Sequence, residues 1–302
     1  MITNEWALLI FTILAQLATG MFLTLLIVRS YAIQKVGLEQ AQQWTDVPLY
    51  LVLPIIALSL LAALFHLGKV VHVIGAVPNL GSSSMSREVV TAVVFAVLVA
   101  LYTLLQWRKS ASEGLRATLG WITAFVGLVL LYCMSVTYML PTQPAWNTFA
   151  TPVDFYTTAF LLGVLGAASA LLANYARKQK TGSRLQDLLR STLQGIAIVA
   201  IILLGVEFLA LPIYMAYLST QGPAALLTLH SLINMYGVAL FLRLILVFVG
   251  AGLLAGYLYH NASLTSKESL SANVAYSAFV LVLLSEILGR FLFYATNYRI
   301  GV

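Results

Sequence analysis

The sequence predicts an all-α integral membrane protein, and three observations lead to that class. Hydrophobic residues make up 61% of the 302 residues and charged residues only 9%, against about 25% charged in an average soluble domain. The chain contains eight apolar runs, each close to the roughly 20 residues that cross a hydrocarbon core as a helix. All five Trp lie near the ends of these runs or between them, where an interfacial aromatic belt is expected.

Each apolar run is expected to form a transmembrane helix, because a chain in lipid must satisfy its backbone hydrogen bonds within helices or closed barrels. Together the helices should form a single polytopic membrane domain of two four-helix bundles, residues 1–140 and residues 141–302. In chain order the predicted helices are Ala7–Val28, Val47–Leu67, Val89–Trp107, Thr118–Leu140, Phe155–Asn174, Thr192–Tyr214, Ile233–Tyr257 and Val274–Tyr294.

The basic residues predict the orientation of the chain. Eleven Lys and Arg residues lie at or after the ends of the odd-numbered runs, and four lie on the opposite side. Short cytoplasmic loops carry the excess of Lys and Arg in membrane proteins, so both termini are predicted to be periplasmic. The net charge of +6 is explained by this orientation, and we expect the protein to contact the lipid bilayer and no nucleic acid.

The few Cys and His residues argue against a metal centre in this chain. A lone Cys133 cannot supply the several thiolates of an iron–sulfur cluster. A haem b would need two axial His on facing helices, whereas His72 and His230 fall in predicted outer loops. No Walker motif or Gly-rich dinucleotide turn is present either. Any redox chemistry must therefore use a bound small molecule or the cofactors of a partner.

Four ionisable residues lie inside the predicted helices, where such groups are costly and often functional. Glu207 and Arg243 lie at matching depth on consecutive helices, so they are predicted to pair across the helix boundary. Glu286 and Arg290 are four residues apart on the last helix and share one face of it. Both pairs are interpreted as structural ion pairs, with a proton path or a substrate site as the alternative.

A second polar group flanks the loop between the second and third predicted helices. His66 ends one helix and Glu88 begins the next, with Lys69 and Arg87 between them, all on the predicted outer side. These residues can form a polar rim that meets water and lipid phosphate. They can also form a redox site, because a His that hydrogen-bonds an oxygen and a carboxylate that takes a proton suit a two-proton ligand such as a quinol.

Several segments of the chain are similar to a known family. The segments are "NEWALLIFTILAQLATGMF", "HLGKVVHVIGAVPNLGSSSMSREV", "PTQPAWNTFATPVDFY", "GVEFLA" and "SEILGRFLFYA", in this order along the sequence. Together they resemble the membrane-anchor subunit of anaerobic dimethyl sulfoxide reductase. The loop after His66 differs, because "KVVHVIGAVP" replaces a stretch richer in Arg and Asn.

The resemblance implies a subunit of the bacterial cytoplasmic (inner) membrane that has no haem or iron–sulfur cluster of its own. It would bind and oxidise menaquinol near the periplasmic face in anaerobic respiration. The electrons would pass to a four-cluster iron–sulfur subunit and then to a molybdopterin catalytic subunit, both on the periplasmic side. The anchor alone would not act on the terminal substrate, an S-oxide or N-oxide.

The resemblance also assigns the predicted site within residues 1–140. His66 would hydrogen-bond a quinol oxygen, and Glu88 would accept or relay a proton. Arg87 and Lys69 would contact the ligand rim or the docked iron–sulfur subunit. The alternatives are a secondary transporter with a central Glu/Arg pair and a quinol dehydrogenase subunit that contains haem b.

Overall fold

The computed structural model describes residues 6–67, 77–177, 183–261 and 268–300, and the regular elements in these ranges are all helical. Eight spans within them are long and apolar enough to cross a membrane, as the sequence predicts. The elements are α1 (Trp6–Val36), α2 (Leu38–Tyr50), α3 (Val52–Leu67), η2 (Val77–Asn79), α5 (Ser84–Trp107), α6 (Glu113–Tyr138), α7 (Ala150–Arg177), α8 (Ser183–Leu218), α9 (Pro223–His230), η3 (Ser231–Met235), α10 (Gly237–Val247), η4 (Phe248–Leu254), α11 (Ala255–Asn261) and α12 (Glu268–Ala295).

Two of the predicted helices are divided into several elements in the structure. The second predicted helix becomes α2 and α3, which form one span with a break at Leu51. Pro54 explains the break, because its ring lacks an N–H and would clash with the carbonyl of Tyr50 one turn earlier. The seventh predicted helix covers four elements, which are the end of the π-helical segment η3, then α10, the π-helical segment η4 and the start of α11.

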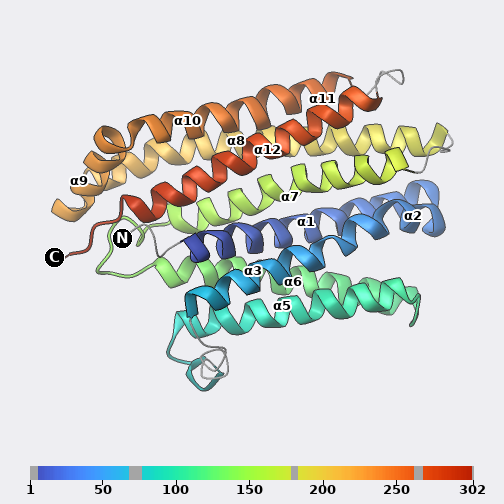
Figure 1. Cartoon of the computed structure of the whole chain (residues 1–302), viewed down its shortest axis with the longest axis horizontal. Coiled ribbons are helices and arrows are strands. Elements are labelled where there is room, and N and C mark those ends of the chain that lie inside the picture. The colour runs from blue at the N-terminus through green and yellow to red at the C-terminus, as the bar shows by residue number, and fades with distance from the viewer. Residues whose placement is uncertain (1–5, 68–76, 178–182, 262–267, 301–302) are drawn as a thin grey trace.

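Helices α1 and α7 lie side by side at the centre of the molecule (Figure 1). They approach closely at Gly20 and Gly163, where a Cβ on Gly163 would lie 2.2 Å from the carbonyl carbon of Gly20. Small residues permit such backbone contact between membrane helices. Helices α3, α5 and α6 lie on one side of this central pair, and α8, α10, α11 and α12 lie on the other.

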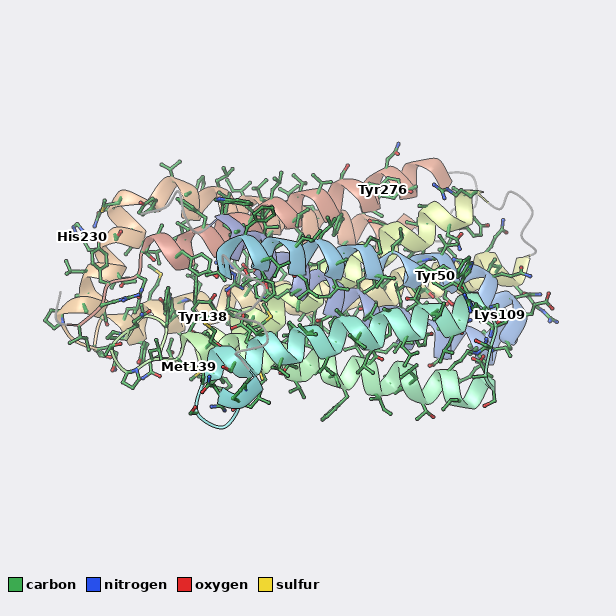
Figure 2. All side chains as sticks on the ribbon, turned by 60° about the horizontal axis from the view of Figure 1, so that its bottom comes forward. Tyr50, Lys109, Tyr138, Met139, His230 and Tyr276 are labelled. Atoms are coloured by element: carbon green, nitrogen blue, oxygen red, sulfur yellow. The ribbon has the colours of Figure 1, made fainter. Side chains whose placement is uncertain are left out.

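The two ends of the bundle carry different side chains, and we name them after the predicted orientation. Met139 and His230 lie at what we call the outer end, and Lys109 lies at the inner end (Figure 2). The first helix begins and the last described residues end at the outer end (Figure 1). The first and last described residues therefore lie at the same end of the bundle, as an even number of spans requires.

A partly buried ion-pair cluster links α1, α2 and α5 near their inner ends. Asp46 accepts from Arg29 at 2.8 Å, from Lys109 at 2.7 Å and from Gln106 at 2.9 Å. Arg29 also donates to the hydroxyl of Tyr102 at 3.1 Å. Breaking a buried pair leaves an uncompensated charge, so these contacts are expected to stabilise the fold.

Three of the Trp side chains are exposed. Trp6 and Trp107 lie at the ends of α1 and α5, and Trp121 lies two turns inside α6. Trp44 differs, because it is only 1% exposed and belongs to the hydrophobic core. Trp146 is half-buried, stacks on the ring of Phe293 and donates its indole N–H to the Phe293 carbonyl at 2.9 Å.

Candidate functional site

The first part of the site lies where α5 begins at the outer end. Ser83 caps this helix, because its hydroxyl accepts from the backbone N–H of Ser86 at 3.2 Å. Arg87 and Glu88 follow in the next turn and point to different surroundings: Arg87 is exposed, and Glu88 is 5% exposed. The predicted carboxyl therefore lies inside the bundle, and the neighbouring guanidinium lies at its surface.

Glu88 meets side chains from two other helices. Its carboxyl faces Thr137 of α6, whose hydroxyl donates to the carbonyl of Cys133 at 2.9 Å, and it interacts electrostatically with Arg290 of α12. The hydroxyls of Tyr138 and Tyr294 interact electrostatically with the same carboxyl and hydrogen-bond to each other at 2.7 Å. We call Glu88, Thr137, Tyr138 and Tyr294 the Glu88 group, and it offers both donors and acceptors to a polar ligand.

The other two predicted site residues are His66 and Lys69. His66 lies in the last turn of α3, at the outer end, and its side chain is outside the described part of the protein. Lys69 lies outside the described residues altogether. Because α3 packs against α5, the backbone of His66 and the start of α5 belong to neighbouring helices at the same end.

The predicted pairing of Glu286 with Arg290 is wrong. Arg290 lies 3.5 Å from Asp154 and donates to Gln16 at 3.2 Å. Its guanidinium also stacks on Phe155, at 3.9 Å from the ring centroid. Spacing of four residues puts Glu286 and Arg290 on one face of α12, but α1 and α7 offer Arg290 other partners.

Arg243 is the centre of a second buried polar group. It lies 2.7 Å from Glu207, 3.4 Å from Asp154 and 3.9 Å from Glu286. The predicted contact between Glu207 and Arg243 is therefore present. Glu286 in turn accepts from the hydroxyl of Thr158 at 2.6 Å. We call Asp154, Glu207, Arg243, Glu286 and Arg290 the central cluster.

Gly289 provides the space for the Arg243 guanidinium. A Cβ at this position would lie 2.6 Å from Arg243 Nε and 2.7 Å from its Cζ. The short distance shows that the guanidinium lies flat against the backbone of α12. Arg243 is also fixed from the backbone side, because Ser285 donates to its carbonyl oxygen at 2.9 Å.

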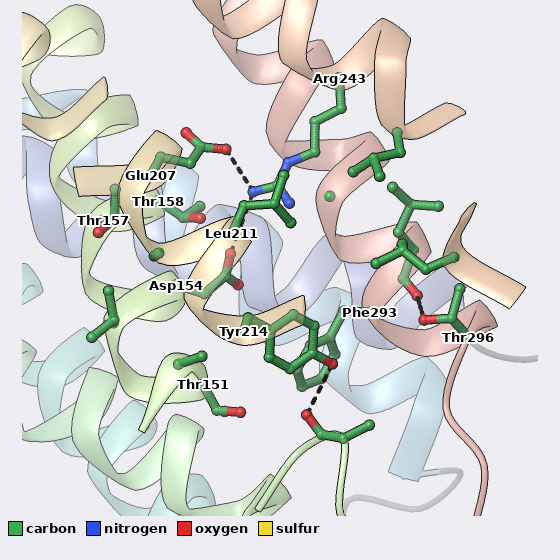
Figure 3. Close-up of a pocket in the computed structure, with 18 of the residues that line it drawn as sticks. Thr151, Asp154, Thr157, Thr158, Glu207, Leu211, Tyr214, Arg243, Phe293 and Thr296 are labelled. Atoms are coloured by element: carbon green, nitrogen blue, oxygen red, sulfur yellow. Dashed lines mark hydrogen bonds and ion pairs between the residues drawn. The ribbon is translucent and has the colours of Figure 1, made fainter. Parts of the chain in front are cut away.

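A cavity extends from the central cluster towards the outer end (Figure 3). Its volume is about 100 Å³. Helices α7, α8, α10 and α12 contribute its walls, which carry Asp154, Glu207 and Arg243 together with the rings of Tyr214 and Phe293. The hydroxyl of Tyr214 donates to the carbonyl of Ala145 at 3.0 Å and fixes the ring at the outer end of the cavity.

Sequence reasoning missed four participants in these groups, namely Thr137, Tyr138, Asp154 and Tyr294. Asp154 lies one residue before a predicted apolar run, so the sequence assigns it to the loop. Tyr138 and Tyr294 lie near predicted helix ends, where Tyr is ordinary at a membrane interface. The sequence does contain a signal for Tyr294. Glu286, Arg290 and Tyr294 follow one another at four-residue spacing, which places them on one face of α12.

The fold and these buried polar groups define a class: an all-helical, multi-pass membrane protein with a polar site at one end of its bundle. Within the described residues, no three His, Cys, Asp or Glu side chains form a group that could hold a metal ion. The profile of the DMSO reductase anchor subunit family (DmsC) matches residues 1–296, and the chain belongs to this family. It is therefore a multi-pass protein of the bacterial inner membrane.

Individual relatives are similar over nearly their whole length. The C chain of anaerobic dimethyl sulfoxide reductase from Haemophilus influenzae is 25% identical, over 99% of this sequence and 96% of its own. The protein of the same description from Escherichia coli is 26% identical, over 99% and 97% of the two sequences. The YnfH chain of anaerobic dimethyl sulfoxide reductase from Escherichia coli is 23% identical over the same shares.

Proposed function

We propose that this anchor subunit oxidises menaquinol at the outer end of its bundle. The electrons pass to a four-cluster iron–sulfur subunit, and a molybdopterin catalytic subunit then reduces an S-oxide or N-oxide. Membership of the anchor family supports the complex. The observation that carries the quinol step is the position of Glu88, a carboxyl that is 5% exposed and faces Thr137 and the Tyr138–Tyr294 pair.

The chemistry follows from what these groups can do. A quinol becomes a quinone when it loses two electrons and two protons, so its oxidation needs a proton acceptor beside a hydroxyl. Glu88 is the acceptor in this proposal, and His66 hydrogen-bonds a quinol oxygen. Tyr138 and Tyr294 lie in the field of Glu88 and orient the same headgroup.

The surface around the start of α5 is assigned to contact with the partner subunit or with the rim of the quinol site. Arg87 is exposed on the turn that carries Glu88, so it contacts the docked iron–sulfur subunit or the rim of the quinol site. We assign Lys69 the same task. The partners dock at the outer end, which keeps the distance between the quinol and the nearest cluster short.

Replacing Glu88 by Gln tests this function in the assembled complex. The change keeps the shape of the side chain and removes the base, so quinol-linked reduction of the terminal substrate should fall on the order of 100-fold. Reduction by a viologen dye, which bypasses this subunit, should persist, as should assembly of the complex. Glu39→Gln is the matched control, because Glu39 is exposed at the inner end.

The same proposal predicts no net charge movement during quinol oxidation, because protons and electrons leave on the same side. Complex reconstituted in sealed vesicles should turn over quinol without building a membrane potential, as measured with a voltage-sensitive dye. A potential that scales with turnover would contradict the outer location of the site. Normal quinol turnover in Glu88→Gln would instead remove the carboxyl from the mechanism.

A further inference from the structure

The central cluster contains more acidic than basic groups. Asp154, Glu207 and Glu286 supply three carboxyls, and Arg243 and Arg290 supply two guanidinium groups. Contacts of 3.9 Å or less join all five groups, and Arg290 is linked to the others through Asp154. With every group ionised the cluster would carry one net negative charge. An uncompensated charge in a buried site is costly. One proton held by the two buried carboxyls, Glu207 and Glu286, cancels that charge.

Several polar atoms of the cluster lack hydrogen-bond partners among the described residues, although they are buried. They are the Glu207 oxygen that does not contact Arg243, one oxygen of Glu286, Nε of Arg243, and Nε and Nη1 of Arg290. Buried polar groups of this kind are ordinarily satisfied by water. The adjoining cavity of about 100 Å³ has room for several water molecules, since one needs roughly 10–15 Å³.

The cavity reaches from these atoms to the outer end of the bundle. Glu207 and Arg243 lie at its inner part, and Ala145, from the loop at the outer end, lies at its other part. The Asp154 side chain lies between them and is 33% exposed. The titratable residues that line the cavity are Asp154, Glu207, Arg243 and the tyrosine Tyr214. Water in this cavity would link the buried carboxyls to the outer solution.

The cluster also reaches back to the Glu88 group. Arg290 interacts electrostatically with Glu88 and with Tyr294 and lies 3.5 Å from Asp154. Tyr294 is one turn further along α12 and hydrogen-bonds to Tyr138. A polar stripe on α12, made by Glu286, Arg290 and Tyr294, therefore passes from the quinol region to the cavity.

We propose that the central cluster and its water-filled cavity form the proton outlet of this subunit. The inference rests on the proposed quinol oxidation at Glu88. Each proton that leaves the quinol passes from Glu88 through the Tyr138–Tyr294 pair and intervening water to the carboxyls of the cluster. A proton already held there leaves through the cavity, so the cluster keeps the same charge after each transfer. The electrons leave separately, to the partner's iron–sulfur subunit.

Two kinds of change in the assembled complex test the outlet. Glu207→Gln removes a carboxyl and keeps its shape, whereas Glu207→Asp keeps the carboxyl. Ala210→Phe fills the cavity without touching a charge, because Ala210 lines it. Leu209→Phe is the matched control for added bulk, because Leu209 is on the same helix and is 68% exposed.

The readouts are quinol turnover and its solvent isotope effect, with viologen-dye turnover as the internal reference. Glu207→Gln and Ala210→Phe should slow quinol turnover about tenfold and increase the ratio of rates in H₂O and D₂O. Glu207→Asp should recover most of the rate, and Leu209→Phe should behave as the parent complex. A merely structural ion pair would change the amount or thermal stability of the complex and leave the isotope effect unchanged.

The results separate this inference from the proposed function. Parent-like quinol turnover and isotope effect in both Glu207→Gln and Ala210→Phe, with Glu88→Gln inactive, would overturn the outlet and leave the quinol site standing. Parent-like turnover in Glu88→Gln would overturn the quinol site itself. An unchanged isotope effect in slowed, unstable complex would also overturn the outlet, in favour of a structural cluster.

Discussion

The contact between α1 and α7 yields the sharpest prediction about stability. In Gly163→Ala the new Cβ would lie 2.2 Å, 2.5 Å and 2.6 Å from the carbonyl carbon, Cα and carbonyl oxygen of Gly20. All three are backbone atoms, so no side chain can move aside. Ordinary contacts at a Cβ begin at 3.4 Å, so the two helices must move apart by about 1 Å. Overpacking of this kind costs about 1–3 kcal/mol of stability.

That separation also affects the polar groups, because Gln16 of α1 and Phe155 of α7 both contact Arg290. We expect the thermal midpoint of the variant in mild detergent to fall by roughly 6–12 °C, taking the upper end of the cost and about 2–4 °C per kcal/mol. Gly195→Ala is the control, because nothing lies within 4 Å of the position that its added Cβ would take. A midpoint unchanged in Gly163→Ala, or lowered equally in Gly195→Ala, would refute the reasoning.

Two further predictions concern the buried charges. Asp46→Asn removes the carboxylate that Arg29 contacts at 2.8 Å and should lower the free energy of unfolding by about 3–5 kcal/mol. Unfolding in a denaturing detergent measures this loss, with Asp187→Asn as the control because Asp187 is exposed. Equal stability of the two variants would contradict the prediction. Gly289→Ala should displace the guanidinium of Arg243, whose Nε would lie 2.6 Å from the new Cβ, and lower quinol turnover more than viologen-dye turnover. Equal loss of both activities in that variant would point to general misfolding instead.

The number and order of the helices could be predicted from the sequence, because apolar runs of membrane length have few other uses. Their full lengths could not. Apolar character marks only the part of a helix that lies in lipid, and α8, for example, begins at Ser183, nine residues before the predicted start at Thr192. The break at Leu51 could have been predicted from Pro54, because proline interrupts the hydrogen bonding of the helix turn that precedes it.

The site was only partly predictable, for a related reason. Matching depth on consecutive helices was enough to pair Glu207 with Arg243, which lie 2.7 Å apart. The partner of Arg290 depends on which helix faces it, and a four-residue spacing carries no such information. Asp154 was missed because it precedes an apolar run, although its position near both Arg243 and Arg290 makes it the link between the two halves of the central cluster.

Direct reduction of the partner's iron–sulfur clusters tests the central claim most closely. Menaquinol is added anaerobically to purified complex, and the reduced clusters are followed by electron paramagnetic resonance in the parent and in Glu88→Gln. The account predicts reduction within one turnover time in the parent and little in the variant, while dithionite reduces both to the same extent. Equal reduction of the clusters by menaquinol in both proteins would contradict a proton-accepting role of Glu88 in quinol oxidation.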